Sequence, residues 1–164
     1  MGLSFAPPPL EPFGPLLLAG VQMSHRLGRA RMQVYSDVAQ QWRDFAAMAH
    51  RLPLLPPRLG YGIGLRIGDG EMDYFSGMVV SDKDRVPPEF AVLEIPALYC
   101  AVFAHHDHLA HLAGTMKLIF GTVLPMAAIE PAEDGPVMFI QRYGENFDPA
   151  TGRGGIEVLV PIRI

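Results

Sequence analysis

Five residues with coordinating or ionisable side chains lie close together in the middle of the chain: His105, His106, Asp107, His108 and His111. His108 and His111 are three positions apart, so on a helix both side chains could reach one metal ion. Beyond these five residues, the spacing places no cysteine or carboxylate as a further ligand. We therefore expect a polar, solvated helix start that binds no structural metal, with a metal site or haem ligation as the alternatives.

The other candidates for catalysis are scattered along the chain. The carboxylates near expected strand ends or on polar strand faces are Glu71, Asp73, Glu94, Glu145 and Asp148. No two of them are spaced for acid–base chemistry, and the sequence has no G-x-S-x-G elbow of a serine hydrolase. The only cysteine, Cys100, lies in an apolar stretch, which predicts core packing and excludes an intrachain disulfide.

Composition indicates one folded domain. The chain has 164 residues, 49% of them apolar and 18% charged, with a net charge of -4. This composition excludes disorder, and the negative charge argues against direct binding of nucleic acid. No apolar run approaches the roughly 20 residues of a membrane span. The first residues lack the pattern of a signal peptide, so we expect a cytoplasmic protein that contacts no membrane.

The first half of the chain predicts strand, helix, strand, strand. Residues 1–15 hold five prolines and predict a loose N-terminal arm, with packing on a neighbouring subunit through Phe5 and Phe13 as the alternative. A strand is expected over 16–23 and a charged loop over 25–31. Ser36 could then cap a helix whose apolar stripe recurs with a period near 3.6: Val38, Trp42, Phe45, Ala49 and Leu52.

Two strands joined by a hairpin turn follow this helix. Residues 60–67 alternate, so Tyr61, Ile63, Leu65 and Ile67 share one face and three glycines share the other. Glycines on one strand face usually let another element approach closely. Asp69-Gly70 is a hairpin signal, and the partner strand is expected over 72–80.

The second half, after a polar link over 81–89, predicts the same order of elements. Strands are expected over 90–95 and 98–104, then a helix capped by Asp107 and closed by Pro125. The stripe of that helix consists of Leu109, Leu112, Met116, Ile119, Phe120 and Val123. Strands expected over 137–143 and 155–162 complete the second half. We therefore predict an α+β fold: a duplicated β-α-β-β module (16–80 and 90–164) with antiparallel sheet and two long helices.

Five segments of the second half resemble a known family. They are Ile95–His105 (IPALYCAVFAH), Ile119–Pro125 (IFGTVLP), Phe139–Tyr143 (FIQRY), Asn146–Pro149 (NFDP) and Glu157–Ile162 (EVLVPI). They are similar, in the same order, to segments of the gyrase-inhibitory-protein-like (GyrI-like) effector-binding domain. That domain occurs in AraC-type and MerR-type transcription regulators and as a stand-alone protein. No helix-turn-helix segment is left over, so the chain resembles the stand-alone members.

The resemblance implies a ligand cleft between the two halves, lined by aromatic side chains that attract lipophilic, often cationic molecules. Met116 and Met126 would add adaptable walls. The residues expected to line it are Trp42, Phe45, Tyr61, Tyr74, Met78, Phe103, Phe120, Val123, Phe139, Gln141 and Tyr143. We expect a lipophilic aromatic ligand, neutral or cationic, no cofactor and no direct contact with nucleic acid. A homodimer or a protein partner is a further alternative.

Two residues depart from the family pattern. Gln141 replaces the glutamate of the family's F-E-R-Y segment, and Val123 replaces the tryptophan before its L-P. Strand alternation puts Phe139, Gln141 and Tyr143 on one face. The resemblance implies that this face points toward the cleft. Binding is therefore the expected function. Hydrolysis of reactive cyclopropane-containing or other electrophilic compounds, for which Gln141 lacks the acid–base group, and gyrase-inhibitor-type protein binding are the alternatives.

Overall fold

The computed structural model describes residues 7–26, 31–68, 71–148 and 151–163. The two main helices are α1 (Arg31–Met48) and α2 (Leu112–Leu118), and α2 continues through a π-helical turn (Ile119–Val123) into α3 (Leu124–Met126). The strands are β1 (Leu10–Phe13), β2 (Leu16–Arg26), β3 (Gly60–Gly68), β4 (Glu71–Val79), β5 (Ala91–Ile95), β6 (Leu98–His105), β7 (Val137–Tyr143) and β8 (Ile156–Pro161).

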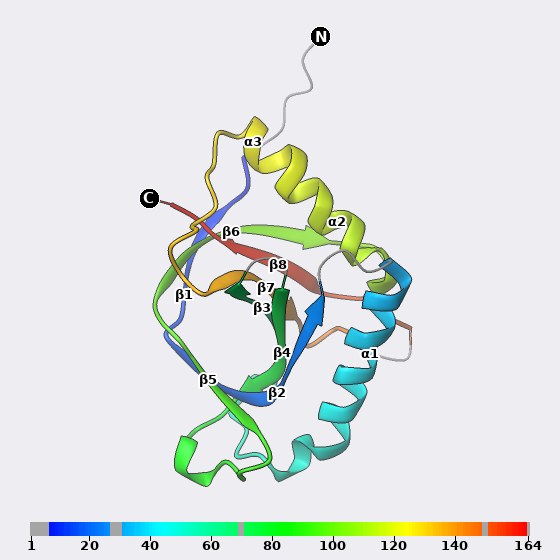
Figure 1. The fold of residues 1–164 in the computed structure, drawn as a ribbon, viewed down its shortest axis with the longest axis vertical. Coiled ribbons are helices and arrows are strands. Elements are labelled where there is room, and N and C mark those ends of the chain that lie inside the picture. The colour runs from blue at the N-terminus through cyan, green and yellow to red at the C-terminus, as the bar shows by residue number, and fades with distance from the viewer. Residues whose placement is uncertain (1–6, 27–30, 69–70, 149–150, 164) are drawn as a thin grey trace.

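The strands form one curled antiparallel sheet in the order β1-β6-β8-β7-β3-β4-β2-β5. Strands β2, β4 and β3 belong to the first half and β6, β8 and β7 to the second, and the halves join where β3 pairs with β7. Each half therefore has the same strand order, with its helix after its first long strand. This confirms the predicted α+β fold with a duplicated β-α-β-β module. The helices lie outside the curl of the sheet (Figure 1).

The two edge strands are exchanged between the halves. β1 precedes β2 in the chain but pairs with β6 of the other half, and β5 precedes β6 but pairs with β2. The expectation of a loose arm is therefore wrong for residues 10–13. Phe13 is 6% exposed and packs on the Tyr61 ring of the same chain, with 5.9 Å between ring centroids. Phe5 lies outside the described residues.

Helix α1 begins earlier than predicted. It starts at Arg31, so Ser36 lies inside it rather than at its cap. Arginine, methionine and glutamine at its start are good helix formers, which favours the earlier beginning. The expected apolar stripe is confirmed: Phe45 and Leu52 are buried, and Trp42 and Ala49 pack against them. The Asp69-Gly70 turn lies outside the described residues.

The second helical segment starts and ends one or two residues later than predicted. Asp107 is not its N-cap; the side chain of His108 accepts a hydrogen bond from the Ala110 N–H instead. The helix also passes through Pro125 and ends at Met126. Proline clashes with the carbonyl four residues before it in an ordinary α-helix, and the preceding turn widens, so the Leu124 N–H donates to Ile119 five residues back.

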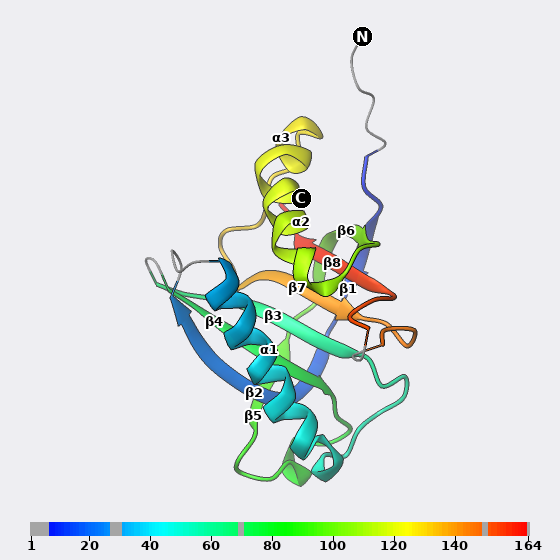
Figure 2. The ribbon, with the colours of Figure 1, turned by 90° about the vertical axis from the view of Figure 1, so that its right-hand side faces the viewer.

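The segment Leu109–Met126 is also long and apolar enough, by length and composition, to cross a membrane. It has 18 residues with a mean hydropathy of 1.3, and 17% of it is buried. The expectation that no apolar run approaches the roughly 20 residues of a membrane span therefore missed this segment. Leu112, Ile119 and Leu124 are nonetheless buried against β8 and Tyr143, so one face of the segment packs on the sheet (Figure 2).

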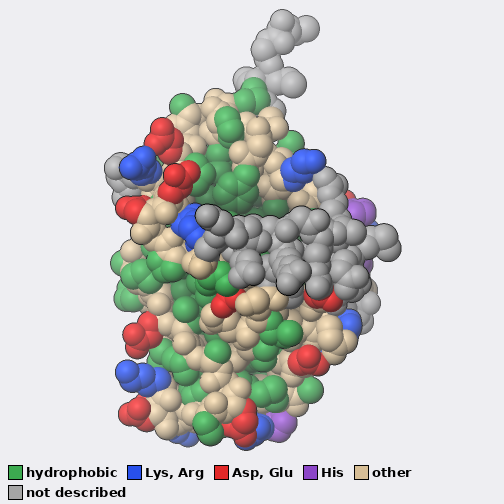
Figure 3. Space-filling model, viewed as in Figure 1, with side chains coloured by type: hydrophobic (Ala, Val, Ile, Leu, Met, Phe, Trp, Pro, Cys, Tyr) green, Lys and Arg blue, Asp and Glu red, His purple; other side chains and the backbone are tan. Residues whose placement is uncertain are grey.

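The sheet buries apolar side chains on both faces. Tyr61, Ile63 and Leu65 share the face inside the curl, as their alternation predicts, together with Phe75 and Ile140. The other face packs under the two helices in three neighbouring clusters. On the molecular face drawn in Figure 3, acidic and basic side chains are interspersed, with hydrophobic side chains between them.

Candidate ligand-binding site

The candidate site lies where the two halves meet, on the helix side of the sheet. Gly62 of β3 pairs with Gln141 of β7, so these residues lie side by side at the centre. Trp42 from α1 and Phe120 from the end of the second helix pack against Tyr74 and its neighbours on the sheet. The site therefore takes side chains from both halves of the duplicated fold.

Glycines on β3 make room for the site. A Cβ atom at position 62 would collide with the Tyr74 hydroxyl and stand 2.9 Å from Gln141 Oε1. A Cβ at position 64 would collide with the Phe139 ring. Tyr74 therefore reaches across the bare backbone of β3 from β4 to β7, which is the close approach that the glycine alternation predicted.

A chain of hydrogen bonds runs through the site. The Trp42 indole N–H donates to the Tyr74 hydroxyl oxygen over 3.2 Å. The Tyr74 hydroxyl donates to Gln141 Oε1 over 2.6 Å, and the Tyr143 hydroxyl donates to the same oxygen over 3.4 Å. Buried polar groups need such partners, so the network fixes the positions of all four side chains.

Tyr74 stays a neutral phenol in this network. Burial raises its pKa to about 12, although the hydrogen bonds with Trp42 and Tyr143 oppose that rise. Desolvation penalises the phenolate, which would carry a charge away from water. At neutral pH the Tyr74 hydroxyl therefore keeps the proton that it donates to Gln141.

Aromatic rings surround this polar chain in edge-on or tilted arrangements. The centroids of Trp42 and Tyr143 are 5.1 Å apart with their planes at 75°, and Trp42 and Phe45 are 6.0 Å apart at 79°. Tyr143 and Phe147 follow at 5.0 Å and 60°. Such arrangements are favourable for aromatic pairs.

The structure brings most of the predicted site residues together. Those around the polar chain, which we call the central cluster, are Trp42, Tyr74, Phe120, Phe139, Gln141 and Tyr143. Phe103 packs in the adjoining cluster under the second helix. Phe45 and Met78 pack in the cluster beside the end of α1, and Val123 is half-buried on the second helix.

Tyr61 is not brought to the central cluster. It packs inside the curl of the sheet with Phe13, because alternation along β3 points it away from the face that Gly60, Gly62 and Gly64 share. Met126, expected as a flexible wall, is 59% exposed at the end of the second helix.

Sequence reasoning missed Gln41. Its side chain is 1% exposed, and its Nε2 contacts the carbonyl oxygens of Tyr74 and Val21 at 2.7 and 3.0 Å. The same nitrogen lies 3.3 Å from Ser76 Oγ. These bonds tie α1 to β2 and β4 and thereby position the adjacent Trp42. No local pattern distinguishes a glutamine that bonds to the backbone of distant strands.

Phe147 and Met138 were also not predicted. Phe147 comes from the loop after β7 and packs against Tyr143 with the two ring planes tilted by 60°. Met138 packs beside Phe139. The contact of a loop residue depends on the path of the loop, which periodicity does not encode.

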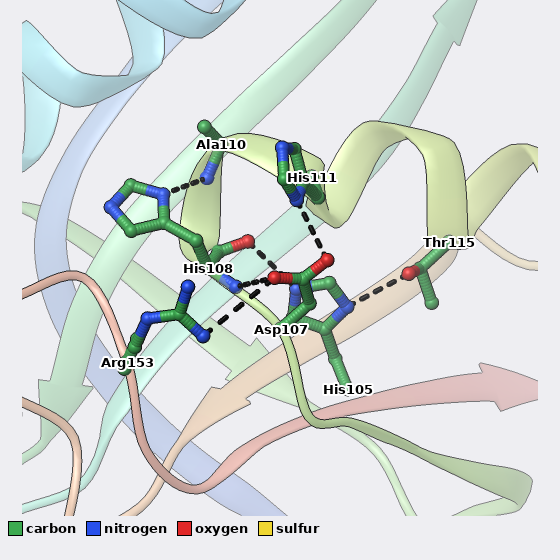
Figure 4. A network of polar contacts seen from close by, with 7 residues as sticks. All are labelled: His105, Asp107, His108, Ala110, His111, Thr115 and Arg153. Atoms are coloured by element: carbon green, nitrogen blue, oxygen red, sulfur yellow. Dashed lines mark hydrogen bonds and ion pairs between the residues drawn. The ribbon is translucent and has the colours of Figure 1, made fainter.

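The histidine cluster closes the corner between β6 and the second helix (Figure 4). His105 is 5% exposed; its Nε2 donates to the His108 carbonyl over 2.9 Å, and its Nδ1 lies 2.8 Å from Thr115 Oγ1. Asp107 accepts from the His108 N–H over 2.6 Å and lies 2.7 Å from His111 Nδ1. All of these bonds join residues of the segment from His105 to Thr115, and none of them reaches the central cluster.

The hydrogen bond from the His108 backbone lowers the pKa of Asp107, and the His111 side chain lowers it further. His108 and His111 rings lie 6.4 Å apart between centroids. Within the described residues, no three histidine, cysteine, aspartate or glutamate side chains are grouped as metal ligands. We continue to expect that this cluster binds no structural metal.

Cys100 is fully buried inside the curl of the sheet, as predicted. Burial raises the pKa of its thiol to about 11. The reactive form of cysteine is the thiolate, so this side chain is an inert part of the core.

A separate hollow of about 180 Å³ lies away from the central cluster, between the turn from β5 to β6 and the loop before β7. Its lining is mostly apolar: Pro96, Leu98, Ala132, Asp134, Gly135, Pro136, Val137 and Pro161. The one carboxylate, Asp134, is exposed. The central cluster, by contrast, combines buried polar groups with aromatic walls.

The sequence profile described as Cass2, integron-associated effector binding protein, matches residues 18–162. The transcriptional regulator BrlR of Pseudomonas aeruginosa is 25% identical over 127 residues, which are 76% of this chain and 46% of BrlR. The chain thus spans less than half the length of that relative.

Solved structures share the fold at low identity. SAV2435 bound to tetraphenylphosphonium has a TM-score of 0.76 and 16% identity, covering 95% of this chain and 93% of that one. The Vibrio cholerae integron cassette protein VCH_CASS2 has a TM-score of 0.68 and 10% identity, covering 96% of each chain. The EcmrR C-terminal domain has a TM-score of 0.61 and 12% identity, covering 94% of this chain and 96% of that domain.

Proposed function

This chain belongs to the Cass2 family of integron-associated effector-binding proteins, and from that membership we propose that it binds a small lipophilic aromatic molecule at the central cluster. The main support for the proposal is the arrangement of side chains where β3 pairs with β7. There, aromatic side chains from both halves surround the buried amide of Gln141. Aromatic walls with a few placed polar groups are typical of small-molecule sites.

The half-buried side chains of the site suit a ligand that enters between the helices. Trp42, Met116 and Phe120 are only partly buried and come from the two helices, whereas Tyr74 and Phe139 beneath them are buried. Movement of the outer side chains would open the apolar surface below without disturbing the sheet. Methionine in particular adapts its shape to different ligands.

The related fold of SAV2435, a protein bound to tetraphenylphosphonium, supports a site for bulky aryl compounds. The hydrolytic alternative has less support, because Gln141 stands where an acid–base group would be needed, and a neutral amide does not act as a general acid or base at neutral pH. We propose that the protein acts as an effector- or drug-binding protein in the cytoplasm.

Titration of the protein with a panel of lipophilic aromatic dyes, followed by tryptophan fluorescence, tests this function. Trp42 is the only tryptophan and lies in the central cluster, so its emission is the signal that we follow, and substitutions decide where a dye binds. We expect saturable changes with at least one dye and about tenfold weaker binding after Phe120→Ala, which removes one wall.

Tyr99→Ala is the matched control. Tyr99 is an aromatic residue, 36% exposed, on β6 away from the cluster, so its removal should leave affinity unchanged. Absence of a saturable response across the panel, or equal weakening by both variants, would contradict binding at the central cluster.

A further inference from the structure

The two polar atoms of the Gln141 amide differ: the oxygen accepts hydrogen bonds from the protein, and the nitrogen donates none within the part of the chain that the structure describes. The residue is 8% exposed, and its Oε1 accepts hydrogen bonds from both Tyr74 and Tyr143. Its Nε2 has no hydrogen-bond partner among the described residues. An amide nitrogen carries two donors, so two N–H groups at the centre of the site are available.

The direction of the hydrogen-bond chain holds the amide in this orientation. The Trp42 indole can only donate, so the Tyr74 oxygen accepts from it. Tyr74 is a neutral phenol, and its single proton goes to Gln141 Oε1. If the amide were turned over, its nitrogen would face two hydroxyl groups, and the Tyr74 proton would lose its 2.6 Å bond to Oε1 and keep only the Tyr143 oxygen as an acceptor.

The free nitrogen must face accessible space. Among the described residues that are not exposed, every fully buried side-chain nitrogen and oxygen has a hydrogen-bond partner. Gln141 Nε2 has none, so this atom is not fully buried and a water molecule can reach it. A donor left unpaired in an apolar site costs free energy, which a ligand acceptor would recover.

We propose that the site selects an uncharged aromatic molecule bearing a strong hydrogen-bond acceptor, such as a carbonyl or phosphoryl oxygen, which accepts from Gln141 Nε2. The inference rests on the proposed function and specifies its ligand. A cation would meet the positive end of the amide dipole. The negative charge of Glu157 does not offset this, because Glu157 is paired with Arg142 at 2.8 Å, and alternation along β7 puts Arg142 on the other face of the sheet.

Two probes of nearly equal size separate the alternatives. Triphenylphosphine oxide is neutral and carries a strong acceptor oxygen, whereas methyltriphenylphosphonium carries a positive charge and a methyl group in the same place. Their dissociation constants are measured on the full chain by calorimetry and by Trp42 fluorescence. We expect the oxide to bind about tenfold more tightly, the scale of one hydrogen bond.

Two substitutions of Gln141 test the assignment. Gln141→Met keeps the length of the side chain and removes the donors, so it should weaken the oxide about tenfold and leave the phosphonium nearly unchanged. Gln141→Glu should reverse the preference at pH 8, because a carboxylate attracts the cation and repels the oxide. Circular dichroism checks that each variant is folded. If a variant does not fold, the comparison of the two probes on the unaltered protein still tests the inference.

The outcomes separate this inference from the function on which it rests. An oxide preference that is lost in Gln141→Met supports the inference. Equal affinities, or tighter binding of the phosphonium to the unaltered protein, overturn it while leaving aromatic binding intact. If neither probe and no dye of the panel changes Trp42 fluorescence, the proposed function fails and the inference fails with it.

Discussion

Substitution of Gly62 by alanine tests the construction of the site. The backbone at Gly62 lies outside the left-handed region, so alanine fits its conformation and the effect comes from the added methyl group. That methyl would collide with the Tyr74 hydroxyl and stand 2.9 Å from Gln141 Oε1. It would therefore separate the two partners of the hydrogen bond at the centre of the network.

The expected cost combines three contributions. Overpacking of a filled site costs about 1–3 kcal/mol, and loss of the hydrogen bond adds about 1 kcal/mol. Replacement of glycine by alanine within a strand returns about 0.5–1 kcal/mol. The net loss in the free energy of unfolding is therefore about 2 kcal/mol, which lowers the melting temperature by roughly 4–8 °C for a chain of this size.

Gly60→Ala is the matched control. A Cβ at Gly60 would lie 3.4 Å from Trp42 Cη2, close to an ordinary contact, so its stability should stay within about 1 kcal/mol of the parent protein. Urea unfolding followed by Trp42 fluorescence measures both variants. If Gly62→Ala were as stable as Gly60→Ala, Tyr74 would not cross β3 as the structure has it.

Three further substitutions probe stability. Gln41→Leu should lower the free energy of unfolding by about 2–4 kcal/mol, because the buried carbonyl of Tyr74 and the partly buried carbonyl of Val21 lose the Gln41 amide as a donor; urea unfolding measures this, and a loss under 1 kcal/mol would contradict it. Burial raises the pKa of Tyr74 to about 12, so its neutral form stabilises the native state below pH 10, and this contribution is lost as the pH rises from 10 to 12. Tyr74→Phe should lack that alkaline loss in thermal melts, and parallel curves for both proteins would refute the assignment. The pKa of Asp107 is lowered by the His108 N–H, so its contribution is present above about pH 4 and lost as the pH falls further; Asp107→Asn should melt with a weaker acid dependence than the parent, and an unchanged dependence would count against it.

The regular elements could be predicted because their periodicity is local. The stripe containing Trp42 and Phe45 and the alternation of Tyr61 with glycines both follow from the geometry of one element. The repeated order of elements about the link at 81–89 then predicted the duplication. The same alternation already placed Tyr61 opposite the glycine face, which separates it from the central cluster.

The features that were mispredicted depend on contacts distant in sequence. The proline-rich residues 10–13 form an edge strand because β6 of the other half offers a partner, and an edge position tolerates proline. Gln41 bonds to backbone carbonyls that only the folded sheet brings to α1. His108 caps the second helix, whereas Asp107 accepts from the His108 N–H and lies beside His111. Both residue types can accept a hydrogen bond at a helix start, so residue type alone does not predict which of the two is the cap.

A crystal structure of the protein with triphenylphosphine oxide tests the central claim most directly. We predict density for the aryl rings on the helix side of β3, between Trp42 and Phe120, with the phosphoryl oxygen within hydrogen-bond distance of Gln141 Nε2. Aryl density in the hollow beside Pro96 and Val137, with the central cluster unchanged, would contradict the account.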